Sequence, residues 1–341
     1  MSQIKIAVIG CGAIAKHRHI PEYANNPNVK MVAFCDPVIE RAEANAKQYG
    51  ANAYKSYQDL LQNEELDAIS VCTPNVYHAP ITIAAVVAGK HVLCEKPMAI
   101  SRDEAKAMIR AAKDAGVILM IGHNQRLMAS HQKGKEILNR GYLGRVLTFR
   151  TAFGHPGPES WSIDGKDSWF FRKDKAFIGA MGDLGVHKAD LIRWLLDDEI
   201  VEVSAFVDTL HKRDTDVDDN AVSIVRTAKG VIGTLTASWS YQPYEDNSTI
   251  LYCEKGTIKL NTDPVYQVIV ERIDGSVERY EVDAVATNEK QTNSGIIDKF
   301  IASIITNTKP EISGEEGLKA LEIVLAMLES SQIKKIVEIS V

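Results

Sequence analysis

The sequence predicts two domains: an α/β domain built on a parallel, doubly wound sheet, followed by an α+β domain with a large, mainly antiparallel sheet. A chain of 341 residues is longer than one hydrophobic core usually serves. Short apolar runs alternate with helical stretches as far as about residue 123, and a succession of strand-like runs appears later in the chain. We therefore expect domains at residues 1–124 and 125–341.

Nearly all-apolar runs in the first half predict strands that are buried on both faces of a parallel sheet. These runs are Ile4–Ile9, Val29–Cys35, Ala68–Cys72, His91–Cys94 and Val117–Ile121. Helix signals lie between them: Pro37 opens a helical stretch that Gly50 closes, and Ser101 with Glu104 forms a capping box. The simplest organisation is a six-stranded parallel sheet.

Beyond Leu127 the pattern changes to that of a second, mixed domain. We expect helices up to Arg140 and over Asp183–Leu196, Ser294–Thr306 and Gly314–Ser330. Strands are expected over Val146–Phe153, Val201–Val207, Ala221–Arg226, Val231–Ser240, Ile250–Glu254 and Val265–Val270. Turn residues such as Lys229-Gly230 between these runs favour antiparallel pairing.

Composition argues against several classes of partner. The net charge of −6 is spread along the chain with no basic arm, so we expect neither nucleic acid nor a membrane surface as a partner, and small molecules fit better. No apolar run approaches the roughly 20 residues that cross a bilayer. The first strand begins too early to leave room for a signal peptide, so we expect a cytoplasmic protein. The five cysteines contain no C-x-x-C pair, and we interpret them as apolar filler.

A glycine-rich turn follows the first predicted strand and opens a helix. The run Gly10-Cys11-Gly12-Ala13-Ile14-Ala15 matches G-x-G-x-x-G/A. Gly10 permits the tight turn, Gly12 lets the backbone approach a pyrophosphate, and Ala15 allows close packing of helix on strand. The free N–H groups at the start of the helix favour phosphate. This context predicts a dinucleotide-binding Rossmann domain.

Asp36 is the second sign of a dinucleotide site. It lies at the end of the second predicted strand, where a carboxylate can hold the ribose hydroxyls of NAD and repel the 2′-phosphate of NADP. The alternative is that Asp36 caps the helix that follows, and both roles can coexist. Arg41 nearby could accommodate a phosphate, so NADP stays an alternative cofactor.

Polar clusters follow two further strands, at the sheet edge where parallel sheets bind ligands. They are Thr73-Pro74-Asn75 with His78, and Glu95-Lys96-Pro97. A lysine at this edge could hydrogen-bond a hydroxyl or carbonyl and stabilise the alkoxide character that develops during hydride transfer. The alternative for Lys96 is a solvated lysine at a turn.

These motifs, His19 and the later run Gly182-Asp183-x-Gly-x-His187-x-x-Asp190 together resemble the Gfo/Idh/MocA oxidoreductases over essentially the whole chain. The resemblance implies that Lys96, Asp183 and His187 are catalytic. The residues expected to bind the cofactor are Gly10, Gly12, Ala13, Ile14, Asp36, Thr73, Pro74, Asn75, His78, Glu95 and Lys96.

Helical spacing is consistent with the second part of this assignment. Asp183 and His187 are four residues apart and share a helix face, and Asp190 lies three residues further along. We expect His187 to act as general base, Lys96 to hold the reacting oxygen and Asp183 to orient a substrate hydroxyl. Asp190 could equally be structural. A metal site from the two aspartates and His187 is conceivable, but the family uses none and no cysteine or second histidine completes it, so no metal is expected.

The substrates implied by the resemblance are sugars, cyclitols and related polyols. The segment Gly154–Lys175 offers polar and aromatic side chains for such a ligand, although exposed polar groups in a loop usually bind only water. The residues proposed to bind substrate are Arg126, His155, Trp169, Arg172, Asp183 and His187, and weaker candidates are Trp161 and Lys173.

Two other functions remain open: an NAD-dependent glycosidase, and a non-catalytic regulator that senses a dinucleotide. The resemblance also implies a homodimer or homotetramer assembled through the antiparallel sheet. Val231, Leu235 and Trp239 share one side of a predicted strand and could form that contact, or they could pack on helices of their own chain.

Overall fold

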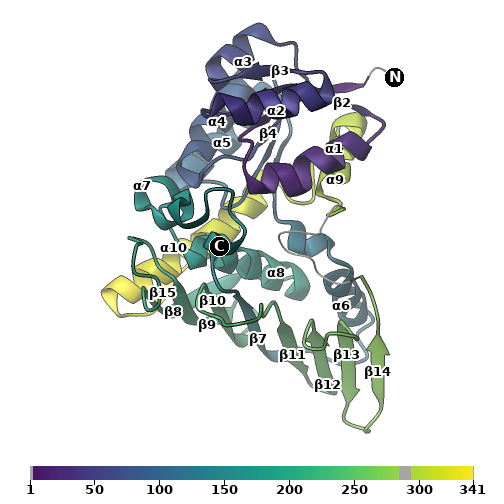
Figure 1. Cartoon of the computed structure of the whole chain (residues 1–341). Coiled ribbons are helices and arrows are strands. Elements are labelled where there is room, and N and C mark those ends of the chain that lie inside the picture. The colour runs from purple at the N-terminus through teal and green to yellow at the C-terminus, as the bar shows by residue number, and fades with distance from the viewer. Residues whose placement is uncertain (1–2, 284–292, 341) are drawn as a thin grey trace. The chain divides into compact units, whose positions relative to one another are not determined.

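The computed structural model of the protein describes residues 3–283 and 293–340, and the chain forms two compact units (Figure 1). Unit 1 consists of Met1–Asn124, Trp161–Trp169 and Ala286–Leu318. Unit 2 consists of Gln125–Ser160, Phe170–Val285 and Lys319–Val341. Each unit therefore contains more than one stretch of the sequence.

Unit 1 is built on a parallel sheet with the strand order β3-β2-β1-β4-β5-β6. The strands are β1 (Ile4–Ile9), β2 (Val29–Cys35), β3 (Asn52–Tyr54), β4 (Ala68–Val71), β5 (His91–Cys94) and β6 (Leu119–Ile121). The five predicted strands are confirmed. The edge strand β3 escaped prediction because it has only three residues, none of them buried. The strand order reverses between β1 and β4, and ligands bind at such a reversal in doubly wound sheets.

The helices of unit 1 are α1 (Ile20–Asn25), α2 (Ile39–Tyr49), α3 (Tyr57–Asn63), α4 (His78–Val87), α5 (Arg102–Ala115) and α9 (Ile296–Thr306). The bounds of α2, α5 and α9 were predicted, and these three helices begin and end close to the expected residues. Helix α2 ends at Gly50, whose φ of 64° is the left-handed conformation that glycine tolerates. Helix α5 begins after Ser101, whose Oγ accepts a hydrogen bond from Glu104 N at 3.2 Å. The predicted cap is therefore confirmed.

Unit 2 contains a sheet with the strand order β14-β13-β12-β11-β7-β10-β9-β8-β15. The strands are β7 (Val146–Gly154), β8 (Ile200–Asp208), β9 (Asn220–Thr227), β10 (Ile232–Ser238), β11 (Thr249–Cys253), β12 (Gly256–Leu260), β13 (Val268–Arg272), β14 (Val277–Tyr280) and β15 (Val337–Glu338). The central pair β7 and β10 is parallel and the other pairs are antiparallel, which confirms the mainly antiparallel prediction.

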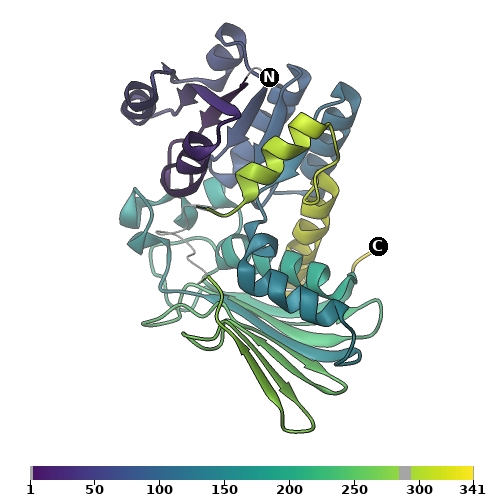
Figure 2. The same cartoon turned by 90° about the vertical axis from the view of Figure 1, so that its right-hand side faces the viewer.

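Among the described residues, helices cover one face of this sheet and none covers the other. In Figure 2, α6 (Ala129–Asn139) and α8 (Val186–Leu196) lie on the same face, and α6 packs on β12 while α8 packs on β7. The part of α10 (Gly314–Ile333) that lies in unit 2 joins the same core. Leu235 and Trp239 are fully buried there, so these two residues pack within their own chain. The exposed apolar residues of the sheet include Phe206, Val222 and Ile224 instead.

Two expectations concern membranes and thiols. Among the described residues, no helix combines the length and the apolar character that crossing a membrane requires.

All five cysteines are unpaired and buried, and burial raises the pKa of Cys11 and of Cys35 to about 12. Such thiols stay protonated near neutral pH, which confirms their interpretation as packing residues.

We predict that Ser101→Ala lowers the free energy of unfolding by about 1 kcal/mol, because the first turn of α5 loses its side-chain acceptor. Urea denaturation measures the change. Ser101→Asp is the matched control, since aspartate also caps helices, and it should stay within a few tenths of a kcal/mol of the wild type. Equal losses in the two variants would show that the cap contributes nothing.

Candidate functional site

The turn after β1 has the geometry that a dinucleotide site needs. Gly10 has a φ of 90°, and a Cβ there would lie 2.4 Å from the carbonyl oxygen of Cys72, so only glycine fits. A Cβ on Gly12 would meet no atom within 4 Å, so the space beside this backbone is open. Ala15 is fully buried at the start of the following helical turn. These positions have the backbone conformation, the open space and the burial that the glycine motif requires.

Asp36 is tied to this turn through its carboxylate. Its Oδ2 accepts a hydrogen bond from Cys11 N at 2.9 Å, and its Oδ1 accepts one from Val38 N at 2.8 Å. The N-cap of α2 is Val38, so the alternative of Asp36 as the helix cap is wrong. A carboxylate has lone pairs beyond these two bonds and can still accept ribose hydroxyls. Arg41 donates a hydrogen bond to Asp164 at 2.5 Å. Its guanidinium group, which could have bound a phosphate, is therefore already paired with a carboxylate.

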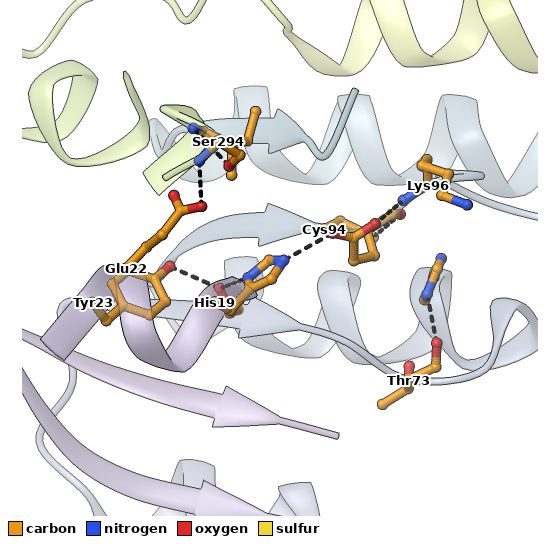
Figure 3. Close-up of polar contacts among 11 residues, drawn as sticks. His19, Glu22, Tyr23, Thr73, Cys94, Lys96 and Ser294 are labelled. Atoms are coloured by element: carbon orange, nitrogen blue, oxygen red, sulfur yellow. Dashed lines mark hydrogen bonds and ion pairs between the residues drawn. The ribbon is translucent and has the colours of Figure 1, made fainter. Parts of the chain in front are cut away.

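Glu95, at the end of β5, belongs to a buried chain of polar groups (Figure 3). Its Oε1 lies 2.8 Å from His19 Nε2, the His19 Nδ1 lies 3.0 Å from Ser70 Oγ, and Ser70 Oγ lies 2.7 Å from the Tyr23 hydroxyl. The Oε2 atom accepts the backbone N–H of Lys96 at 3.2 Å. This buried chain therefore ends on the backbone of the proposed catalytic lysine.

The charge of Glu95 depends on these neighbours. Burial alone would raise the pKa of its carboxyl group, but the hydrogen bond and the charge of His19, together with Arg18 and Lys96, lower that pKa to about 2. Glu95 is thus ionised at neutral pH and can only accept hydrogen bonds. His19 Nε2 must therefore carry the proton that it shares with Glu95.

His78 joins the two polar clusters of unit 1. It is buried at the start of α4, with its Nδ1 at 2.7 Å from the carbonyl oxygen of Pro97 and its Nε2 at 2.8 Å from that of Thr73. Both polar atoms of the ring are thus engaged by the backbone. Asn75, in the same cluster, is buried as well.

In unit 2, Asp183 lies on a π-helical turn, Met181–Gly185, that runs directly into α8. The Asp218 carboxylate holds the start of this turn by accepting the N–H groups of Gly179 at 2.7 Å and Met181 at 2.8 Å. A Cβ on Gly179 would lie 1.8 Å from the Asp218 carbonyl oxygen. A glycine is therefore required where the chain enters the turn that carries Asp183.

The carboxylate of Asp183 is buried among polar and aromatic groups. Trp239 Nε1 donates a hydrogen bond to its Oδ2 at 3.1 Å, and His155 Nε2 lies 4.0 Å from the same oxygen. Gly157 N donates to His155 Nδ1 at 3.0 Å, so the neutral ring carries its proton on the Nε2 that faces Asp183. The Trp239 indole and the His155 ring therefore both lie beside the Oδ2 atom of Asp183.

His187 lies in the first turn of α8 and is also buried. Its ring centroid is 5.9 Å from that of Phe153, whose ring also packs edge-on against His155 at 6.2 Å. Three residues further along α8, Asp190 accepts two hydrogen bonds from Arg126, at 2.7 and 2.6 Å. This buried, bidentate ion pair gives Asp190 a structural role, which the sequence had left open. It also pairs the guanidinium group of Arg126, a predicted substrate residue, with a carboxylate.

The lysine next to His187 was not singled out from the sequence. Lys188 is fully buried, with its Nζ at 3.2 Å from the carbonyl oxygen of Asn247. Burial lowers the pKa of Lys188 to about 7, although Asp246 and Glu245 raise it. Nothing in the sequence marks this residue, because a lysine on a helix is normally exposed.

The other predicted substrate residues are placed differently. Trp169 is half-buried in unit 1, and Arg172 is exposed in unit 2. Among the loop candidates, His155 is the residue that the structure brings beside Asp183. Within the described parts of the chain, no group of three or more His, Cys, Asp and Glu side chains could hold a metal ion.

Comparison with known proteins supplies the context for these two sets of residues. Residues 4–123 match the oxidoreductase family with an NAD-binding Rossmann fold, GFO_IDH_MocA, and residues 131–259 match the GFO/IDH/MocA C-terminal domain. The chain is 30% identical to levoglucosan dehydrogenase of Pseudarthrobacter phenanthrenivorans over 70% of this chain and 68% of that protein. It is 27% identical to myo-inositol 2-dehydrogenase of Thermotoga maritima over 98% of each chain.

A solved structure supports the same likeness. The solved structure of levoglucosan dehydrogenase in complex with NADH and L-sorbose is similar to this chain with a TM-score of 0.88 and 25% identity, over 99% of each chain. The likeness therefore covers both units.

We predict that the free energy of unfolding of Glu95→Gln falls less steeply at acid pH than that of the wild type. The pKa of Glu95 is depressed in the folded protein, so its contribution to stability is present above pH 4.5 and is lost as the pH falls toward about 2. Between these values the wild type should lose on the order of 3 kcal/mol more free energy of unfolding than the variant. Urea titrations at several pH values measure this. Glu43→Gln, at an exposed position, should keep the wild-type slope, and an unchanged slope in Glu95→Gln would contradict the assignment.

We also predict that Gly179→Ala lowers the free energy of unfolding by about 2 kcal/mol, because its Cβ meets a backbone carbonyl that cannot move without shifting the turn. Gly185→Ala, on the same turn, is the comparison: its Cβ would meet the Sδ atom of Met181, which lies toward the end of a flexible side chain and can adjust. Thermal unfolding should rank Gly179→Ala as the less stable variant. The reverse order would contradict this account of the turn.

Proposed function

This chain belongs to the GFO/IDH/MocA oxidoreductase family, and we propose that it transfers a hydride between NAD and a hydroxyl-bearing carbon of a sugar or cyclitol. The observation that carries the proposal is the turn after β1, with open space beside Gly12 and the Asp36 carboxylate bound to the same turn. Relatives named as levoglucosan dehydrogenase and myo-inositol 2-dehydrogenase support the substrate class.

The residues of unit 1 suit the cofactor. Gly10 and Gly12 shape the turn for the pyrophosphate, and Asp36 is placed to accept ribose hydroxyls. The ion pair of Arg41 with Asp164 and the negative charge of Asp36 both favour NAD over NADP. When bound, the nicotinamide accepts or returns the hydride.

Three side chains carry the chemistry in this proposal. His187 takes the hydroxyl proton, a task that suits an imidazole near neutral pH. Lys96 donates a hydrogen bond to the reacting oxygen and stabilises its developing negative charge. Asp183, with one oxygen bonded to the Trp239 indole, uses its remaining lone pairs to orient a substrate hydroxyl, and His155 lies beside it as a further contact for the sugar.

Assembly and location complete the proposal. The exposed apolar side chains Phe206, Val222 and Ile224 on the open face of the sheet favour a homodimer or homotetramer that covers them. The unpaired, buried cysteines suit a reducing compartment, which favours the cytoplasm.

A panel of levoglucosan, myo-inositol and simple glucosides, incubated with NAD and monitored at the absorbance of NADH, tests the function. Net NADH production from a sugar or cyclitol supports the dehydrogenase. Release of the leaving group of a glucoside without net NADH would identify a glycosidase instead. Binding of NAD with neither outcome would identify a regulator.

We predict that His187→Ala lowers kcat by on the order of 100-fold or more and leaves the Kd of NADH within about twofold of the wild type. The reason is that the imidazole acts on the substrate proton and is not needed for the dinucleotide. Steady-state kinetics and NADH fluorescence measure the two quantities. His211→Ala, at an exposed position in the same unit, is the control and should change neither. Undiminished turnover in His187→Ala would eliminate the assignment.

A further inference from the structure

Both nitrogens of the His78 ring face acceptors that cannot donate. The Nδ1 atom lies 2.7 Å from the Pro97 carbonyl oxygen, and the Nε2 atom lies 2.8 Å from the Thr73 carbonyl oxygen. A carbonyl oxygen only accepts, so each hydrogen bond needs an N–H on the histidine. A neutral imidazole has one N–H and would turn a lone pair toward the other oxygen. The imidazolium form alone satisfies both.

The two carbonyls belong to the two turns that the proposed function uses. Thr73 opens the turn after β4, which is a candidate for contact with the dinucleotide, and Pro97 directly follows Lys96. His78 is therefore a bridge from one turn to the other. Because the ring is buried, water cannot replace a missing hydrogen bond at either end.

The opposite side of Lys96 is held by the second histidine of this region. His19 bonds the Glu95 carboxylate at 2.8 Å, and that carboxylate also accepts the backbone N–H of Lys96. The residue before Lys96 and the residue after it are thus each bonded to a buried histidine. The lysine backbone is therefore held from both sides.

We propose that His78 is a positioning residue that fixes the backbone at Lys96 and couples it to the Thr73 turn. The inference rests on the proposed role of Lys96 and replaces direct cofactor contact as the role of His78. The bond to Pro97 holds the lysine, and the bond to Thr73 holds the turn on the dinucleotide side. Both bonds are complete only while the ring carries two protons.

The proton on His78 is opposed by burial. Burial lowers the pKa of His78, whereas its two carbonyl partners and the charge of Glu95 raise it and Lys96 lowers it, and the result is a pKa below the usual range. The two charged groups that act on the ring most strongly, Glu95 and Lys96, both lie at the turn after β5. Acidification therefore completes the bridge, and a rise in pH removes one of its two hydrogen bonds.

Two conservative variants separate the two ends of the bridge. The amide nitrogen of asparagine comes near the Nδ1 position of histidine, so His78→Asn keeps the donor to Pro97. The amide nitrogen of glutamine comes near the Nε2 position, so His78→Gln keeps the donor to Thr73. His91→Gln is the matched control, because His91 lies in β5 and binds Ile118 N at its Nδ1, at the other end of the same strand.

The experiment measures kcat and the KM of NAD with the panel compound of highest turnover. His78→Gln should lower kcat about tenfold with the KM of NAD close to the wild-type value, and His78→Asn should keep kcat within about threefold and raise that KM. The ratio of the wild-type kcat to that of His78→Gln should grow as the pH falls from 8 to 5. His91→Gln should lower the melting temperature without changing kcat, KM or this ratio.

Equal kcat values for the wild type and His78→Gln, or a ratio that does not change with pH, would overturn the inference. A crystal structure of His78→Gln gives a test that needs no substrate: the Pro97 carbonyl should move away from residue 78 while the Thr73 carbonyl stays. An unmoved Pro97 carbonyl overturns the inference. Lys96→Met separates the two proposals, because an active Lys96→Met enzyme refutes the catalytic role of Lys96 itself. An inactive one beside a fully active His78→Gln refutes only the positioning role.

Discussion

The buried negative charge of Glu95 is the constraint on which much of unit 1 depends. An ionised carboxylate in the interior must be surrounded by donors, and here the donors come from the helical turn after β1 and from the backbone of Lys96. The same carboxylate leaves no room beside Gly122, where a Cβ would lie 3.0 Å from Glu95 Oε1. One charged group thus connects the ends of β1, β5 and β6, which all lie at the edge where a parallel sheet receives its ligand.

In unit 2, two neighbouring aspartate carboxylates are bound by backbone N–H groups. The carboxylates of Asp218 and Asp219 each collect N–H groups from chain segments that have no regular partner: Asp218 holds the turn that leads to Asp183, and Asp219 accepts from Leu210, His211 and Lys212. These hydrogen bonds are partly buried, so the loss of an acceptor would destabilise the folded chain. The adjacent aspartates therefore order both a loop and the turn that carries Asp183.

Periodicity and turn chemistry were sufficient to predict most of the fold. Runs such as Val29–Cys35 and His91–Cys94 coincide with β2 and β5, because a strand buried on both faces has an unmistakable apolar composition. The strand β14 was not predicted, because two of the four residues of Val277–Tyr280 are charged and the strand is partly exposed. In the candidate site, motif spacing predicted roles for Gly10, Asp36 and the lysine turn, but it could not show that His78 uses both ring nitrogens within the chain. Hydrogen-bond partners depend on which carbonyls the fold brings near, and Trp239 and Phe153 became neighbours of Asp183 and His187 only through packing of β10 and β7.

The parallel pairing of β7 with β10 has a consequence for how unit 2 is made. β7 leaves the ribosome long before β10 and β11, the two strands that flank it, so its N–H and C=O groups on both edges lack partners until the chain has been extended through Cys253. Contacts between residues so distant along the chain form slowly, and a nascent strand with two bare edges is prone to intermolecular association. During its synthesis this unit therefore passes through a stage in which β7 is open to intermolecular association.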